Sequence, residues 1–279
     1  MITVSQRRYI EDYAYVPEHL PDYVSAISKT EAFLIDDFLI HVKKDYLIFV
    51  GYPFREPFDK KQMVKVFENA IKRFKPKSVA LTGPAIPSSI NGCAHPPADH
   101  YYRLDLSSLS ISQKLRNMLK RAGRELSVEE GNAFDEEHRR MIAEFLKTHP
   151  VGEATGSIFN RIDEYLSSSS TARVFDARSS RGELVAFDVA EFRPKDYALY
   201  MFNFGSNARY VPGASDLLLF EVIQQAKAEG RKYVNLGLGI NAGVAFFKTK
   251  WGSVPFLPYA SCFYAPSRKE DLDSLLRKL

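Results

Sequence analysis

The residues best suited to holding a charged ligand lie in the segment 209–215, which reads Arg-Tyr-Val-Pro-Gly-Ala-Ser. Here a predicted strand is followed by a predicted apolar helix. Backbone N–H groups at the start of a helix have no partner within it, and the helix dipole favours an anion there. Gly213 and Ala214 leave room for a close approach, and Arg209 could add a charged donor. The segment therefore predicts a site for a phosphate-bearing ligand; the alternative is an ordinary helix cap made by Gly213 and Ser215.

A carboxylate on a predicted strand could supply acid–base chemistry. The strand runs from Leu184 to Phe192, and its alternation places Asp188 on the same face as Ala186 and Ala190. A carboxylate that faces an apolar sheet surface has a raised pKa, which suits a group that accepts a proton from an amine. Asp188 is thus the candidate general base. The alternatives are an ion pair with an arginine or a position that faces water.

Basic residues form two further patterns. Lys248 and Lys250 would share a face of an extended chain and could grip a phosphate or the acceptor end of a tRNA; the alternative is a solvated edge. A basic run on a predicted helix could contact RNA or anionic lipid headgroups, although solvent-facing helices show the same pattern. This run comprises Lys114, Arg116, Lys120, Arg121 and Arg124. The net charge of +4 permits a phosphate-bearing partner but is below that of a dedicated nucleic-acid binder.

Several other chemistries are not indicated. The six histidines show no H-x-x-x-H or H-E-x-x-H spacing, and no metal site is predicted. Cys93 and Cys262 lie far apart and are expected to be reduced thiols. The sequence has no G-x-S-x-G elbow and no Walker loop, which sets aside serine hydrolases and nucleotide triphosphatases. No apolar run reaches the roughly 18 residues that span a bilayer, and we expect no integral membrane segment and a cytoplasmic protein.

The elements that must position these residues alternate between strands and helices. Strands are predicted at 32–42, 46–51, 78–82, 101–106, 197–204 and 233–236, with two more between 171 and 192 around a turn at 179–182. Helices are predicted after Asp59, after Ser110 or Ser112, from Asp135 to Lys147 and from Ser215 to Ala228. The three consecutive strands before residue 205 imply an antiparallel meander. The helix that follows completes a strand–helix–strand unit.

The chain length favours two domains. The stretch 86–100 is rich in Pro, Ser, Asn and Gly and is the best candidate for a linker. We therefore expect an N-terminal half at residues 1–98 and a C-terminal domain at residues 99–279. The helix-to-strand unit from Phe67 to Gly83 resembles the one from Phe220 to Gly237. This likeness indicates either an internal duplication or chance similarity between two generic units.

The C-terminal part resembles the GNAT-related acyltransferases. The matching pieces are the helix end at 226–230, the strand end Asn235-Leu236-Gly237 and the sequence Phe-Lys-Thr-Lys-Trp-Gly at 247–252. The chain looks nearest to the Fem-type aminoacyltransferases and to the C-terminal domain of phosphatidylglycerol lysyltransferases. The resemblance covers residues 100–255, and the N-terminal half only in its overall layout.

The resemblance implies an α/β (α+β) fold of tandem GNAT-like domains, with mixed, mostly antiparallel sheets flanked by helices. It also implies that two neighbouring strands splay apart around an acyl donor, whose phosphates would face Gly213, Ala214 and Ser215. Asn203 would border the reacting end, as a candidate catalytic residue. The implied reaction is acyl or aminoacyl transfer to an amine or a hydroxyl, from an acyl-CoA or an aminoacyl-tRNA, with no metal.

Three positions depart from the pattern of that superfamily. Tyr210 replaces the usual Gln or Arg of the phosphate loop, and Ser215 replaces its last Gly or Ala. Phe247 replaces a tyrosine that often protonates the leaving thiolate. These departures leave open an alternative function, a catalytically inactive binding module with the same fold.

Overall fold

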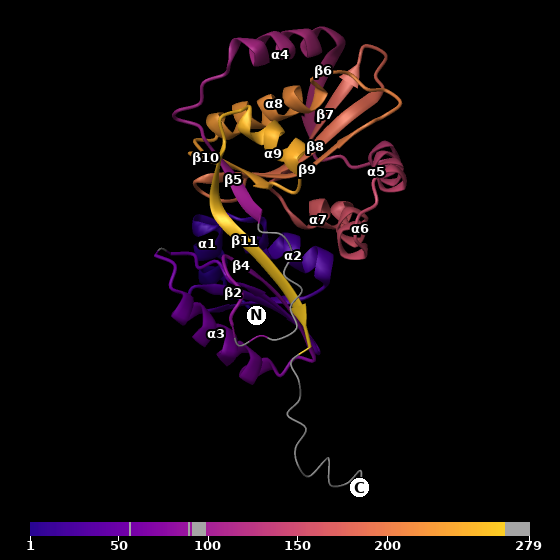
Figure 1. Ribbon diagram of the computed structural model, residues 1–279. Helices are drawn as coiled ribbons and strands as arrows, with labels where there is room; N and C mark the ends of the chain where they lie inside the picture. The colour runs from indigo at the N-terminus through magenta and orange to yellow at the C-terminus, as the bar shows by residue number, and fades with distance from the viewer. Residues whose placement is uncertain (56, 89, 91–98, 266–279) are drawn as a thin grey trace, which may run out of the picture. The chain divides into compact units, whose positions relative to one another are not determined.

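The computed structural model describes residues 1–55, 57–88, 90 and 99–265, which form two compact units (Figure 1). The N-terminal unit contains Met1, Ile2 and the described parts of 30–98 and 258–265. The C-terminal unit contains residues 3–29 and 99–257. The first 29 residues thus fold largely with the part of the chain that follows residue 98. Most of the predicted linker lies outside the described residues.

The N-terminal unit is a mixed sheet with a helix packed on it. Its strand order is β1-β2-β3-β4-β11, in which β3 and β4 are parallel and the other pairs antiparallel. The elements are β1 (Glu31–Ile35), β2 (Phe38–Lys43), β3 (Tyr46–Val50), α3 (Lys60–Phe74), β4 (Ser78–Gly83) and β11 (Val254–Tyr264). Helix α3 buries Met63, Val66, Phe67 and Ala70 against the sheet, as the spacing of its apolar residues predicts.

Two sequence-based expectations fail in this unit. The single strand predicted at 32–42 is the hairpin of β1 and β2, because Asp36 adopts a left-handed conformation (φ 50°) and turns the chain. Cys262 is disulfide-bonded, so the expectation of a reduced thiol is wrong for this residue. Cys93 lies outside the described residues.

The C-terminal unit is built on a larger mixed sheet. Its strand order is β5-β10-β9-β8-β7-β6, in which β9 and β10 are parallel and the other pairs antiparallel. The strands are β5 (Asp99–Asp105), β6 (Leu126–Gly131), β7 (Ala172–Ser179), β8 (Leu184–Glu191), β9 (Tyr197–Gly205) and β10 (Tyr233–Leu238). The predicted meander is confirmed as β7-β8-β9. Strand β6, which the sequence did not reveal, extends it by one strand.

Helices cover both faces of this sheet (Figure 1). They are α1 (Val4–Tyr13), α2 (Pro21–Ser28), α4 (Gln113–Glu125), α5 (Glu136–Thr148), α6 (Glu153–Phe159), α7 (Ile162–Ser168), α8 (Ala214–Ala228) and α9 (Ala242–Thr249), with a 3₁₀ turn at Pro17–His19. Helix α8 packs across β7, β8 and β9, and α4 packs on α8. The opposite face holds α5 and α7, with α2 packed on α7.

Helix α9 includes Lys248 and ends just before Lys250, two residues that were considered as part of an extended chain. The Asn241 side chain accepts a hydrogen bond from the Val244 N–H (3.0 Å) and caps the helix. Lys248 and Lys250 therefore do not alternate along a strand. Among the residues that the structure describes, no helix combines the length and the apolar character needed to cross a membrane.

Candidate functional site

Strands β9 and β10 separate after a short stretch of parallel pairing. The pairing ends at Leu199 and Asn235, whereas β9 continues to Gly205 and β10 to Leu238. Beyond this point Asn235 accepts a hydrogen bond from the Gly237 N–H (2.8 Å), and the register of β10 with β5 is irregular. The splayed strands implied by the family resemblance are therefore present.

Strand β9 also carries a bulge at this place. Its register with β8 shifts between Val189 and Ala190, so that Met201 has no opposite residue on β8. A bulge adds one residue to one strand and redirects the side chains around it. Here it places Tyr200 and Asn203 toward the same side of the sheet as α8.

A cavity of about 360 Å³ lies beside the separated part of β9. One wall is the start of α8, from Gly213 to Asp216, and another is the end of β9 with the loop that follows. Phe145 of α5 and His149, which follows that helix, form a further side, and Phe247 of α9 forms another. The cavity thus has the polar start of α8 on one side and aromatic side chains on others.

The start of α8 is free of the side chain that usually caps a helix. Gly213 is the N-cap residue at φ +88°, and no side chain accepts a hydrogen bond from the first turn. Ser215 does not bond to its own helix; its hydroxyl donates to Asn203 Oδ1 (3.2 Å). The sequence alternative of an ordinary cap made by Ser215 is therefore wrong. The Ala214 N–H donates to Val211 O (3.2 Å), so the free amides of the first turn begin at Ser215.

Helix α3 of the N-terminal unit shows the opposite arrangement. Asp59 caps it by accepting a hydrogen bond from the Lys61 N–H (2.8 Å). The parallel strands β3 and β4 stay paired to Val50 and Thr82, and the Gly51 N–H continues the contact to Thr82 O (2.6 Å). A Cβ atom at Gly83 would lie only 3.1 Å from Gly51 Cα. The seam between β3 and β4 is therefore closed where that between β9 and β10 is open.

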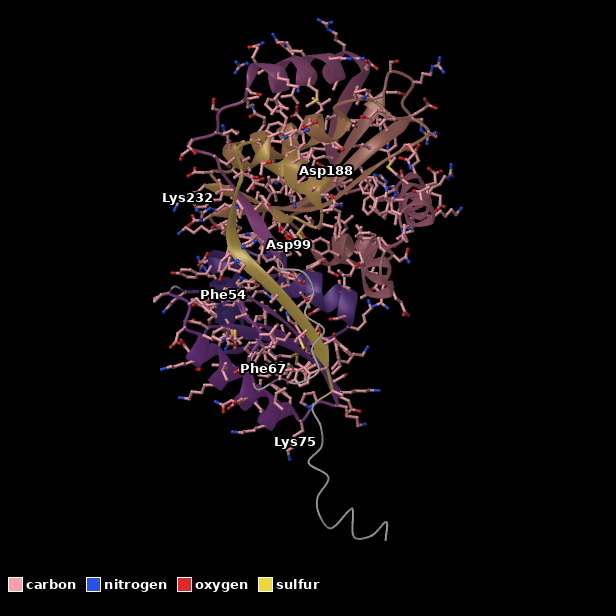
Figure 2. The ribbon with its side chains drawn as sticks, in the orientation of Figure 1. Phe54, Phe67, Lys75, Asp99, Asp188 and Lys232 are labelled. Carbon is pink, nitrogen blue, oxygen red and sulfur yellow. The ribbon has the colours of Figure 1, made fainter. Side chains whose placement is uncertain are left out.

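Asp188 lies in the C-terminal unit (Figure 2). Its side chain is buried, with no exposed surface. Its Oδ1 accepts a hydrogen bond from Asn203 Nδ2 (2.5 Å), across the register of β8 and β9. Burial raises the pKa of Asp188 to about 8, although the Asn203 and Tyr200 side chains act against the rise, and the nearby Asp216 carboxylate adds to it. Asp188 therefore neither pairs with an arginine nor faces water, which were the two alternatives.

The second oxygen of Asp188 has an unusual neighbour. The Tyr200 hydroxyl lies close enough to lower the pKa of Asp188, yet neither Tyr200 Oη nor Asp188 Oδ2 has a hydrogen bond of normal geometry. Burial, reinforced by the Asp188 carboxylate, raises the pKa of Tyr200 well above its ordinary value. At neutral pH both groups are therefore protonated and uncharged, which makes their burial tolerable.

An ion pair between the buried Asp216 and the partly buried Lys250 holds the first turn of α8. Asp216 accepts hydrogen bonds from Lys250 Nζ (2.8 Å) and from Trp251 Nε1 (3.0 Å). Lys250 Nζ also lies 4.7 Å from the centre of the Phe247 ring. The residues that follow α9 thereby fix the helix start that lines the cavity.

The structure brings together some of the residues proposed from the sequence and separates others. Asn203, Gly213, Ala214 and Ser215 line the cavity, and Asp188 lies directly behind Asn203. Arg209 does not line it; its Nε donates to Leu184 O (3.3 Å) at a separate shallow depression. The structure therefore does not bring Arg209 together with Gly213, Ala214 and Ser215 in the cavity lining.

Lys248 also lies outside the cavity lining. It is buried, and its ammonium group donates to Leu238 O. Burial lowers the pKa of Lys248 to about 7, and the Asp99 carboxylate acts in the opposite direction. A lysine in this position holds the end of β10 to α9 and is not directed at a phosphate in the cavity.

Sequence reasoning missed four residues of the site: Phe145, His149, Tyr200 and Asp216. Tyr200 and Asp216 belong to runs that read as ordinary apolar strand and helix, and no local pattern distinguishes them. His149 follows a predicted helix by two residues, so its proximity to the cavity depends on packing across the sheet. No group of histidine, cysteine and acidic side chains suited to a metal ion occurs within the described ranges.

Comparisons with known proteins identify the fold. No protein-family model and no curated protein matches the sequence. The C-terminal domain of a protein assigned as a lysylphosphatidylglycerol synthetase from Agrobacterium fabrum superimposes with a TM-score of 0.63 at 17% identity. That alignment covers 98% of this chain and 94% of the other.

Two further solved structures extend the likeness. FemX aligns with a TM-score of 0.61 at 11% identity, over 93% of this chain and 96% of its own. A GCN5-related N-acetyltransferase from Kribbella flavida aligns with a TM-score of 0.52 at 12% identity, over 90% and 95% of the two chains. The chain therefore has a GNAT-like fold, with neighbours among the Fem-type proteins and lysylphosphatidylglycerol synthetases, as predicted.

Proposed function

We propose that this chain is an acyltransferase that moves an acyl or aminoacyl group from a phosphate-bearing donor to an amine or a hydroxyl. The donor is a thioester such as an acyl-CoA, or an aminoacyl-tRNA. The observation that supports this most is the cavity at the uncapped start of α8, beside the place where β9 leaves β10. The cavity therefore brings a helix start suited to an anion next to a gap between two strands of the sheet.

The phosphates of the donor bind at the first turn of α8. The amides of Ser215 and Asp216 offer hydrogen-bond donors, and the helix dipole adds favourable charge. The Asp216 carboxylate would repel a phosphate, but Lys250 and Trp251 hold and neutralise it. The charge that remains at the helix start favours an anion.

Asn203 stabilises the reacting carbonyl in this mechanism. Its side chain amide has two N–H donors, and Asp188 occupies one of them. Asn203 lines the cavity, so the second donor can reach the carbonyl oxygen, where negative charge develops during attack by the acceptor. The oxygen of the same amide is held by Ser215, which fixes its orientation. Holding donor and acceptor together provides the rest of the acceleration.

We assign Asp188 a positioning role in place of the general-base role expected from sequence. It has no exposed surface, and the Asn203 side chain lies between it and the cavity. A carboxamide is neither acid nor base at ordinary pH, so Asn203 cannot relay a proton from the cavity to Asp188. Protonated Asp188 can still accept from Asn203 through its carbonyl oxygen. The buried pair therefore keeps Asn203 in a single orientation.

The second candidate function is a catalytically inactive binding module. It would be favoured by a helix start blocked by Pro212 or by the Tyr210 side chain. Tyr210 is instead 75% exposed, and the cavity beside it reaches Gly213 and Ser215. This observation favours a site that admits a donor.

Calorimetric titration tests the proposal with three kinds of donor: acetyl-CoA, longer acyl-CoAs and charged tRNA. We expect saturable binding of one class by the folded protein. If tRNA is the donor, its gel shift should weaken steeply as salt rises, because phosphate contacts release counterions. Binding of none of them by correctly folded protein would exclude the transferase function.

A further inference from the structure

The cavity contains an imidazole that the transfer mechanism above does not use. His149 follows α5 and lines the cavity together with Asn203. Its side chain is exposed, in contrast to the buried His138 of α5. An acceptor that attacks a donor carbonyl beside Asn203 would therefore share the cavity with this ring.

The orientation of the His149 ring is fixed by stacking. The ring lies parallel to that of Phe145, with centroids 4.4 Å apart and an interplanar angle of 7°. Phe145 is held in turn by edge-to-face contacts with Phe204 (5.3 Å) and Phe159 (6.0 Å). The imidazole is therefore placed on a rigid aromatic support and is not a freely rotating surface side chain.

A hydrogen bond joins His149 to Thr148: the Thr148 hydroxyl oxygen lies 2.9 Å from His149 Nδ1. The same hydroxyl lies 3.2 Å from the carbonyl oxygens of Glu144 and of Phe145, and either can accept its proton. In the tautomer in which Thr148 donates to one of these carbonyls, its oxygen accepts from Nδ1, and Nε2 carries a lone pair. Among the described residues no partner occupies Nε2.

We infer that His149 is the general base of the transfer, which takes a proton from the acceptor amine or hydroxyl through Nε2. This inference rests on the proposed function. The acceptor nitrogen or oxygen bonds to the donor carbonyl carbon, and His149 Nε2 takes the proton that the acceptor loses. The C–S or C–O bond of the donor then breaks, and the imidazolium returns the proton to the leaving thiolate or alkoxide. His149 thus replaces the acid that Phe247 cannot provide.

The test measures turnover of the donor that binds in the calorimetric titration: acetyl-CoA, a longer acyl-CoA or charged tRNA. Release of free CoA or uncharged tRNA is followed with water and with a panel of primary amines as acceptors. We expect His149→Ala to lower kcat by about 10²-fold or more, the range typical of a lost general base, with the dissociation constant of the donor unchanged. Added imidazole should restore part of the rate.

Two matched variants separate a base from a structural support. His149→Phe keeps an aromatic ring on Phe145 but has no lone pair, so it should be as slow as His149→Ala. His100→Ala changes an exposed histidine of β5 in the same unit, outside the cavity lining, and should leave kcat unchanged.

Each outcome decides between the two claims. Failure of the wild-type protein to bind any donor rejects the proposed function, and the inference about His149 with it. Donor binding without turnover also rejects both, because a catalytically inactive binding module would give this result. Normal turnover by His149→Phe, or a loss in His149→Ala that imidazole does not restore, rejects the inference alone, while the transferase function stands.

Discussion

At the scale of the residue, the chemistry of Asp188 follows from its place on β8. Alternation along the strand directs it to the apolar face, and the absence of an arginine or of solvent leaves it with a pKa of about 8. Its partner Asn203 could not be paired with it from the sequence. That pairing depends on the register of β8 and β9 across a bulge, which no residue pattern reveals.

The raised pKa of Asp188 predicts a pH dependence of stability. The folded protein binds the proton of the Asp188 carboxyl group more tightly than the unfolded chain does. The stabilisation that results from this difference is therefore fully present below pH about 3.8. It is lost as the pH rises through about 8. Asp188→Asn keeps a carbonyl that can accept from Asn203 but cannot ionise. The free energy of unfolding of the variant relative to wild type should therefore increase by a few kcal/mol between pH 5 and pH 9.

Urea unfolding of both proteins at pH 5, 7 and 9 checks this expectation. The free energy of unfolding of Asp188→Asn should rise relative to that of the wild type as the pH increases. Parallel stability curves over that range would show that Asp188 titrates normally and that its environment is not as dry as the structure indicates.

At the scale of the element, the start of α8 is shaped by its packing on α4. A Cβ atom at Gly213 would lie 2.9 Å from Met118 Cγ and 3.4 Å from Ala122 Cβ, so glycine is required for contact as well as for its positive φ. The absence of a side-chain cap and the close helix contact thus have the same origin. The sequence indicated that a glycine stands at the start of α8. It did not indicate that α4 packs against this glycine.

Gly213→Ala should therefore destabilise the protein more than Gly230→Ala. Gly230, just beyond the other end of α8, also has a positive φ (72°), but a Cβ atom there would meet nothing within 4 Å. The backbone strain alone costs about 1–2 kcal/mol, and Gly213→Ala adds the clash with Met118. Thermal or urea unfolding of the two variants gives the comparison. Equal losses would show that α4 does not restrict the start of α8.

At the scale of the whole molecule, the sequence predicted the antiparallel meander from hydrophobic periodicity and turn residues, which are local. The GNAT-like fold and its mixed sheets were implied by the resemblance to the GNAT-related acyltransferases. The sequence did not predict the helices between Val4 and Ser28, nor that they fold with the C-terminal unit. Helix α1 is mostly polar and has little periodic apolar signal, and its partners are distant in sequence.

In the candidate site, too, the features set by local sequence patterns were predicted and those set by tertiary packing were not. Gly213, Ala214 and Ser215 were predicted because a loop before a helix is a local pattern. Arg209 and Lys248 lie outside the cavity lining, because the direction of a long side chain depends on which carbonyl oxygen it contacts in the fold. His149 was not predicted, because its place in the cavity lining and its stacking on Phe145 depend on tertiary packing.

The two units contain related strand–helix–strand arrangements, but only one of the two seams is open. The start of α3 is capped by Asp59 and lies beside a closed seam, so it should hold no donor. The start of α8 is uncapped and lies beside separated strands. We therefore predict a single donor site per chain, at the first turn of α8.

The most direct measurement is calorimetric titration of the donor into three variants of the first helical turns. Ser215→Asp places a negative charge at the first turn of α8, which is compatible with the helix dipole but repels the donor phosphates. Lys61→Asp makes the equivalent change in α3, and Ser215→Ala removes the hydroxyl without adding charge. We predict one site per chain in the wild type and affinity at least tenfold lower in Ser215→Asp. Lys61→Asp should keep wild-type affinity and Ser215→Ala should stay close to it, whereas unchanged binding by Ser215→Asp, or loss in Lys61→Asp, would contradict a donor held at the start of α8.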